Sequence, residues 1–191
     1  MRGLVLYARS REVPVGGAAA VGGLVAVWGF ARWVSDGRGD PRLAALAVAM
    51  AVAATAAGLG GQDVALDRTA AIRWAPRRAA HVLLIGVLAG TVLLALQTVA
   101  GEAMPAASAV RNSAGLAGLA ALGAAAFGRQ FAWTLPITWC SVAYFIPITP
   151  DLPVQAAAWM MTPPGTPAAT WTALALTTTG TLTYALTGPR R

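Results

Sequence analysis

The sequence predicts an all-α, polytopic integral membrane protein with six transmembrane helices. Of its 191 residues, 57% are hydrophobic and only 11% are charged, whereas soluble domains carry about 25% charged residues. The apolar residues also form runs of roughly 17–22 residues, which is the length that crosses about 30 Å of hydrocarbon as an α-helix. Too few charges remain for a water-facing surface, so we expect a single transmembrane domain over residues 1–191.

The expected elements follow the apolar runs in chain order. Segment 1–12 is short and basic, and we expect it to lie at the membrane surface as an amphipathic helix. The six spans are expected at 13–34, 43–60, 81–100, 110–127, 131–148 and 168–186. A charged loop, 61–80, joins the second and third spans, and a proline-rich loop, 149–167, joins the fifth and sixth.

Local signals set the expected ends of these elements. Asp63 is expected to cap a short helix that ends near Trp74, and Pro76 is expected to break the chain before the third span. Pro136 predicts a kink near the start of the fifth span. The apolar stretch 156–161 is expected to form a short helix at the membrane interface. His81 is expected to be an interfacial residue at a span boundary.

Small residues at helical spacing predict where helices pack closely, because they let two backbones approach. The fourth span is the least hydrophobic and is expected to pack inside the bundle. These helix-packing candidates are Gly22, Gly86, Gly90, Ala117 and Ala121.

The arginines predict the orientation. Both termini, the 61–80 loop and the turn at Arg129 share one side, which receives ten of the fourteen arginines, and the other side receives four. Basic loops stay in the cytoplasm, so both termini and 61–80 are expected there, in a bacterial plasma membrane. The net charge of +7 is thus attributed to topology and headgroup contact with membrane lipids, and not to nucleic-acid binding.

The sequence lacks the residues of a self-sufficient enzyme. It has no lysine, which a phosphate-binding GxxxxGK[ST] loop requires, and all seven carboxylates lie outside the expected spans. We therefore expect no catalytic residue, no metal and no cofactor of its own. One alternative is a lipid-modifying membrane enzyme that uses Asp63 and Asp67, which could share a helical face. Another is a scaffold or immunity protein that only binds partners.

The stretches RNSAGLAGLAALGAAAFGRQFAWTLPITW (111–139) and LDRTAAIRWAPRR (66–78), with the six-span layout, resemble the permease subunit of small actinobacterial type-2 ATP-binding-cassette (ABC) exporters. The resemblance implies a separate ATPase subunit that binds ATP–Mg and a second permease protomer, identical or not. It also makes 61–80 the loop that docks on the ATPase. The charged candidates for that contact are Asp63, Asp67, Arg68, Arg73, Arg77 and Arg78, for which lipid-headgroup anchoring remains the alternative.

Overall fold

The structure, a computed structural model, describes residues 22, 25, 29, 41–56, 59, 74–100 and 105–190. Within these residues the regular structure is entirely helical, which confirms the all-α prediction for this part of the chain. The segment 1–12, most of the first expected span and residues 60–73 lie outside the described residues. The helices are α3 (Pro41–Ala56), α5 (Trp74–Ala100), α6 (Ala106–Phe127), η2 (Arg129–Phe131), α7 (Thr134–Phe145), α8 (Leu152–Ala157) and α9 (Pro167–Thr187).

The start of α5 differs from the sequence expectation. The helix begins at Trp74 and runs without a break for 27 residues, so 74–80 belongs to α5 and not to a loop. Pro76 is its third residue. The first four amides of a helix have no partner within the helix, so a proline there removes no hydrogen bond. His81, expected at a span boundary, is consequently the eighth residue of α5 and is buried.

The fifth expected span is divided. Residues 129–131 form the short helix η2, and α7 covers only the 12 residues from Thr134 to Phe145. Pro136 lies in the first turn of α7, where it starts the helix and does not kink it. The helix ends before Pro147, because Ile146 takes the extended conformation that a residue before proline prefers.

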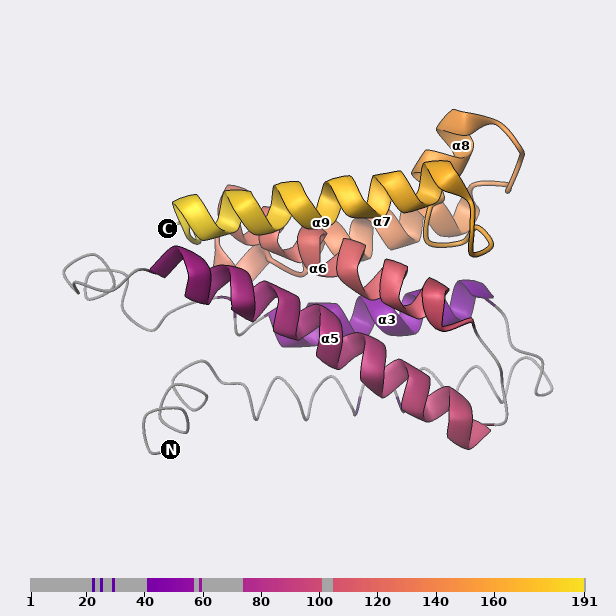
Figure 1. Cartoon of the computed structure of the whole chain (residues 1–191), viewed down its shortest axis with the longest axis horizontal. Coiled ribbons are helices and arrows are strands. Elements are labelled where there is room, and N and C mark those ends of the chain that lie inside the picture. The colour runs from indigo at the N-terminus through magenta and orange to yellow at the C-terminus, as the bar shows by residue number, and fades with distance from the viewer. Residues whose placement is uncertain are drawn as a thin grey trace.

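Consecutive long helices run in opposite directions along one axis (Figure 1). One end, named here the Trp74 end, holds the start of α5 and the last residues of α6 and α9, where Arg190 bonds to Ala124. The opposite end, named the Phe145 end, holds the end of α7 and the starts of α6 and α9, where Arg111 bonds to Thr162. Five long helices alternate between these two ends.

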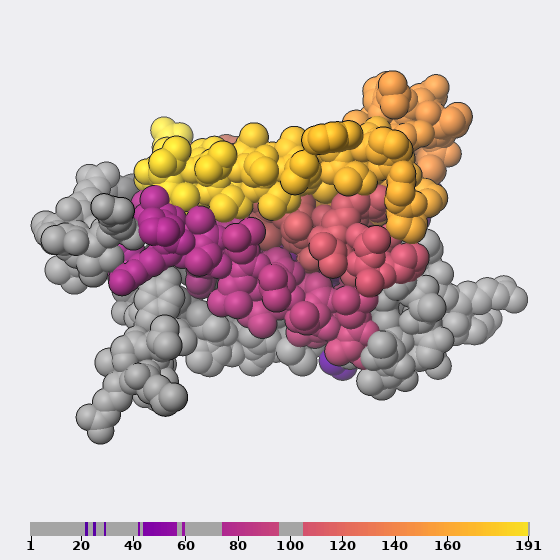
Figure 2. Space-filling model, viewed as in Figure 1, coloured from indigo at the N-terminus to yellow at the C-terminus, as the bar shows by residue number. Residues whose placement is uncertain are grey.

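Helix α6 lies at the centre of the bundle and contacts α3, α5, α7 and α9. Fourteen of its 22 residues are buried, which confirms that this weakly hydrophobic helix packs inside. On the face seen in Figure 2, α5 and α9 lie together toward the Trp74 end, and the first part of α6 emerges between them toward the Phe145 end. Helices α5, α6 and α9 therefore all pack against one another.

The closest helix contact joins α6 and α9 through two glycines. A Cβ atom added to Gly180 would lie 2.0 Å from the carbonyl oxygen of Gly118, and one added to Gly118 would lie 2.3 Å from the carbonyl oxygen of Leu176. Both distances are far shorter than a van der Waals contact. The two backbones therefore touch directly, and this crossing requires glycine at both positions.

A looser contact joins α5 and α6. A Cβ at Gly86 would lie 3.5 Å from the Ala117 side chain, which is ordinary packing, and one at Gly90 would lie 2.9 Å from the Ser113 hydroxyl. Ala121 is fully buried in the same core. Of the predicted packing residues, Gly22 differs: it is exposed, and a Cβ there would meet no atom of the described residues within 4 Å.

Three described helices have the length of a membrane span: α5, α6 and α9, with 27, 22 and 21 residues. Among the described residues, only the segment Trp74–Ala95 of α5 is also apolar enough, with a mean hydropathy of 1.9. Helix α6 falls short because its first turns carry Arg111, Asn112 and Ser113, and α9 falls short because it is rich in threonine.

The threonines of α9 are less polar than their hydropathy suggests. Six of them donate their hydroxyl to the carbonyl four residues earlier in the chain. They are Thr170, Thr172, Thr177, Thr178, Thr179 and Thr187. A hydroxyl that is bonded within its own helix needs no water, so such a helix can face an apolar environment.

The glycine crossing gives a direct test. Gly180→Ala places a methyl group against the Gly118 backbone, so we expect α6 and α9 to separate and the protein to lose about 1–3 kcal/mol of stability. Thermal unfolding of the full-length protein in detergent measures the change. Gly29→Ala is the matched control, because a Cβ there meets none of the described part of the chain within 4 Å. Equal midpoints for the two variants would contradict the crossing.

Candidate functional site

Two arginines at the Trp74 end come from the start of α5. Arg77 is exposed, and its guanidinium lies over the Trp74 indole with the Cζ atom 5.7 Å from the ring centroid. That geometry is a cation–π contact. The ring fixes the arginine beside the helix start while leaving the charge accessible.

Arg78 instead turns toward the end of α9. A Cβ at Gly188 would lie 2.9 Å from the Cζ and Nη1 atoms of Arg78, so the guanidinium lies directly on this glycine. Gly188 has φ 72°, which favours glycine, and its amide donates to the Tyr184 carbonyl to close the helix. A cation at this position is stabilised by the negative end of the helix dipole.

The tail after α9 returns to the end of α6. The backbone amide of Arg190 donates to the Ala124 carbonyl at 3.0 Å, and its Nη1 donates to the Ala126 carbonyl at 3.2 Å. The Tyr184 hydroxyl donates to the Leu59 carbonyl. The Ala124 carbonyl also accepts the Gly128 amide. Together these bonds tie the end of α6, the end of α9 and Leu59, which follows α3, to one another.

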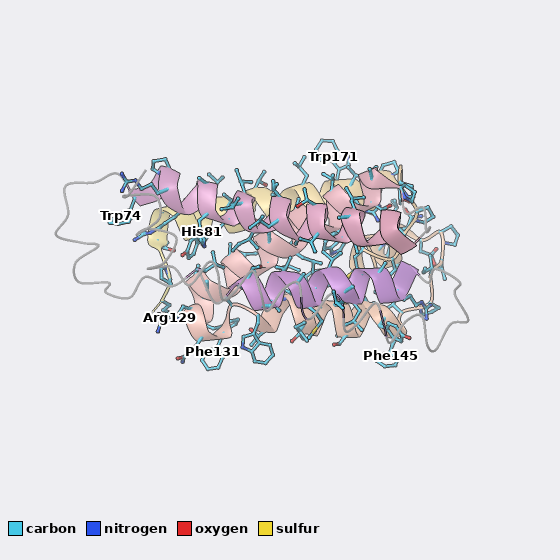
Figure 3. The ribbon with its side chains drawn as sticks, turned by 90° about the horizontal axis from the view of Figure 1, so that it is seen from below. Trp74, His81, Arg129, Phe131, Phe145 and Trp171 are labelled. Atoms are coloured by element: carbon cyan, nitrogen blue, oxygen red, sulfur yellow. The ribbon has the colours of Figure 1, made fainter. Side chains whose placement is uncertain are left out.

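Arg129 follows α6 on the short helix η2. It is exposed, and large exposed aromatic side chains stand on both sides of it at Phe127, Phe131 and Trp133. Figure 3 shows Arg129 and Phe131 at the same end of the bundle as Trp74 and His81. The basic surface therefore covers more than one side of this end.

The charge at the Trp74 end is uniform within the described residues. Its described charged side chains are Arg77, Arg78, Arg129 and Arg190, all positive. The one carboxylate among the described residues, Asp151, lies in the loop after α7 at the Phe145 end. The described surface of the Trp74 end therefore favours anionic partners.

The Phe145 end contains a buried polar contact that the sequence reasoning did not identify. Arg111 is only 8% exposed, and its Nη2 and Nη1 donate to the carbonyls of Thr162 and Pro163 at 2.7 and 3.1 Å. Its Nε donates to Asn112 Oδ1 at 3.2 Å, and Asn112 Nδ2 donates to the Met160 carbonyl at 2.9 Å. These two side chains hold the segment 157–163, named here the strap.

The strap packs closely against α6 at a glycine. Trp159 is fully buried, and an added Cβ at Gly115 would lie 2.5 Å from its indole ring. From α7, Trp139 Nε1 donates to the Ala157 carbonyl at 2.8 Å. The expected interfacial helix at 156–161 is therefore wrong: the helix is α8, which ends at Ala157, and 158–162 is buried in turns. Aromatic and methionine side chains gain more free energy inside the bundle than at its rim.

The structure places the predicted site residues in three groups. Arg77 and Arg78 meet the Trp74 end, as described above. Gly86, Gly90, Ala117 and Ala121 lie in the core between helices of one chain. The other coupling candidates, Asp63, Asp67, Arg68 and Arg73, lie outside the described residues.

At both ends of the bundle, the side chains available for binding are hydrogen-bond donors. At the Trp74 end the donors are exposed guanidinium groups, and at the Phe145 end they are buried and satisfied by backbone carbonyls. Within the described ranges, no group of three or more His, Cys, Asp or Glu side chains is placed to hold a metal ion. A signal for the strap contact was present in the sequence: an Arg–Asn pair at the start of an otherwise apolar helix is costly unless its donors are satisfied.

Truncating Arg111 tests the strap contact. Arg111→Met removes three donors and leaves the Thr162 and Pro163 carbonyls without them, so we expect a loss of about 1–3 kcal/mol per buried group left unpaired. Hydrogen–deuterium exchange should rise in 158–163 and stay unchanged in α9. Val110→Ala, a change at an exposed neighbour, is the control. Unchanged exchange in the strap of the Arg111→Met protein would show that Arg111 does not hold it.

Comparisons with known proteins identify no relative. No protein-family model matches the chain, and no curated protein or solved structure matches it. The function proposed for this chain therefore depends on the geometry of its two ends and of the bundle between them.

Proposed function

We propose that the chain is the membrane-spanning permease subunit of an ATP-driven ABC exporter, energised by a separate ATPase that binds at the Trp74 end. The observation that carries the proposal is the pairing of an alternating apolar bundle with an end whose described charged side chains are all arginines. Residues 61–80 then form the coupling region, and 149–167, which includes the strap, faces the outside.

The surface of the bundle supports placement in a membrane. Helix α5 exposes Leu83, Leu84, Val87 and Leu88, and α9 exposes Leu174, Leu182 and Leu186, the last at 75%. Contiguous apolar surface of this kind is rare on a soluble monomer. The buried faces of the same helices carry small residues, which is the arrangement that lets helices associate within lipid.

Exposed aromatic residues mark both ends. Phe127, Phe131 and Trp133 lie at the Trp74 end, and Phe145 and Trp171 lie toward the Phe145 end. Aromatic rings concentrate at the two interfaces of a bilayer. Two aromatic zones with apolar helices between them support a bundle that crosses the membrane from one end to the other.

The alternating helices support the topology. Five long helices, α3, α5, α6, α7 and α9, correspond to the second to sixth spans, and the first span falls mainly outside the described residues. Helix α7 is about 18 Å long at 1.5 Å per residue, so the chain around it, or a thinner bilayer, makes up the difference. The basic Trp74 end is then cytoplasmic.

The unbroken α5 supports coupling from that end. It extends for about 40 Å at 1.5 Å per residue, and its inner half packs on α6 through Gly86 and Gly90. A partner that moves the chain at 61–73 would displace the start of this rod, and α6 would receive the displacement. The absence of lysine from the chain excludes a GxxxxGK[ST] phosphate loop, so the ATPase is a second protein.

Cysteine labelling tests the topology. Cys140 is 1% exposed, so Cys140→Ala provides a cysteine-free background without changing the surface. We expect Asp151→Cys to react with a membrane-impermeant maleimide on intact cells, and Arg129→Cys to react only after lysis. Reaction of both variants on intact cells, or of neither before lysis, would contradict the six-span arrangement.

Co-purification tests the coupling. We expect an ABC-type ATPase to be recovered with the full-length chain in mild detergent, and Arg68→Glu with Arg73→Glu to reduce its recovery by about tenfold or more, since like charges at a docking surface cost several kcal/mol. Arg42→Glu, at the opposite end of the bundle, should leave recovery unchanged. Failure to recover any ATPase with the unaltered protein would refute the proposal.

A further inference from the structure

One corner of the Trp74 end carries side chains that the proposed coupling to an ATPase does not involve. It consists of Phe127, Arg129, Phe131 and Trp133, between α6 and α7, and is named here the aromatic–arginine corner. Phe127, Phe131 and Trp133 are 55%, 43% and 49% exposed. Apolar rings and a guanidinium thus alternate along one turn of chain, all on the surface.

The backbone of this corner is held by a hydrogen bond and by close packing, which fix where its side chains leave the surface. Gly128, with φ 99°, turns the chain, and its carbonyl accepts the Phe131 amide at 3.0 Å. Ala132 is buried against Gly123, whose added Cβ would lie 3.1 Å from the Ala132 carbonyl oxygen. Phe131 and Trp133, on either side of the buried Ala132, are exposed.

A second arginine is fixed next to the corner. Arg190 is held on the last turn of α6 by its amide bond to Ala124 and its side-chain bond to Ala126, one residue before Phe127. The side chain of Arg129, three residues after Ala126, makes no hydrogen bond or ion pair with the described part of the chain. The corner therefore combines one pinned and one available guanidinium beside three aromatic rings.

This combination selects among anionic partners. A protein surface that binds arginines through carboxylates has no need of three exposed aromatic rings around them. A bilayer surface provides both environments within a few ångströms: phosphate groups for guanidinium and an interfacial region for aromatic rings. Arginine pairs with phosphate through two parallel hydrogen bonds, which gives the contact geometric selectivity.

We propose that the aromatic–arginine corner is a binding site for the headgroup phosphate of an anionic phospholipid in the bilayer leaflet at the Trp74 end. This proposal rests on the membrane placement proposed above and is independent of ATPase docking at 61–80. Arg129 contacts the phosphate, Arg190 adds positive charge from the end of α6, and Phe127, Phe131 and Trp133 lie at the level of the headgroups. The corner thereby fixes the depth of the α6–α7 turn.

The proposed lipid site is tested by measuring which phospholipids the purified protein retains. The purified full-length protein is equilibrated in detergent with equal amounts of phosphatidylglycerol and phosphatidylcholine that have the same acyl chains, and the lipids that remain bound are counted by native mass spectrometry. We expect the unaltered protein to retain phosphatidylglycerol preferentially. Arg129→Gln should lower that preference about fivefold, the effect expected of one arginine at an anionic surface, and Arg129→Lys should largely preserve it.

Arg42→Gln is the matched control, because Arg42 lies at the Phe145 end, 5.6 Å from the Tyr144 ring centroid. An unchanged preference in Arg129→Gln overturns the site. So does full displacement of phosphatidylglycerol by excess inorganic phosphate, which would show that a free anion suffices. A protein that stays in water without detergent and retains neither lipid overturns the membrane placement itself. These results separate failure of the lipid site from failure of the proposed function.

Discussion

The contact between the backbones of α6 and α9 is the constraint on which the rest of the structure depends. Gly118 and Gly180 bring the two helices to within atomic contact of each other, and both helices then serve as surfaces for the others. Side chains contribute little at this crossing. Its stability comes from the many weak attractions between closely packed atoms. Larger residues at either glycine would move α9 away and uncover α6.

Because the core is built from small residues, the polar groups are concentrated at the ends, and there arginines bond to backbone carbonyls. Arg190 does so at the end of α6, and Arg111 does so on the strap. Arg78, on Gly188, lies at the end of α9. Each arginine is therefore part of the architecture as well as part of the charge pattern. Arg78 and Arg190 lie at helix ends, whereas Arg111 fixes the segment that precedes α9.

The helical class and the burial of α6 could be predicted from the sequence, because length, composition and small-residue spacing determine them locally. The start of α5 is not predictable from Pro76 alone, because the position of a proline within the first turn decides whether it breaks or begins a helix. The strap was missed because Trp159 and its neighbours look like interfacial residues until Gly115, 44 positions away in the chain, is placed beneath them. Contacts between distant segments leave no local periodicity, so the partners of Arg111 and of Gly180 could be identified only in three dimensions.

The hydrogen bonds that hold the strap leave most of its amino-acid sequence free to vary. Arg111, Asn112 and Trp139 all donate to main-chain oxygens of the strap, and every amino acid carries such an oxygen. They recognise the path of the chain and are indifferent to most of its composition. Positions such as Thr162 and Pro163 can therefore drift in sequence while the fold persists, provided that the three donors stay. The composition of the strap could diversify without reconstruction of the helices beneath it.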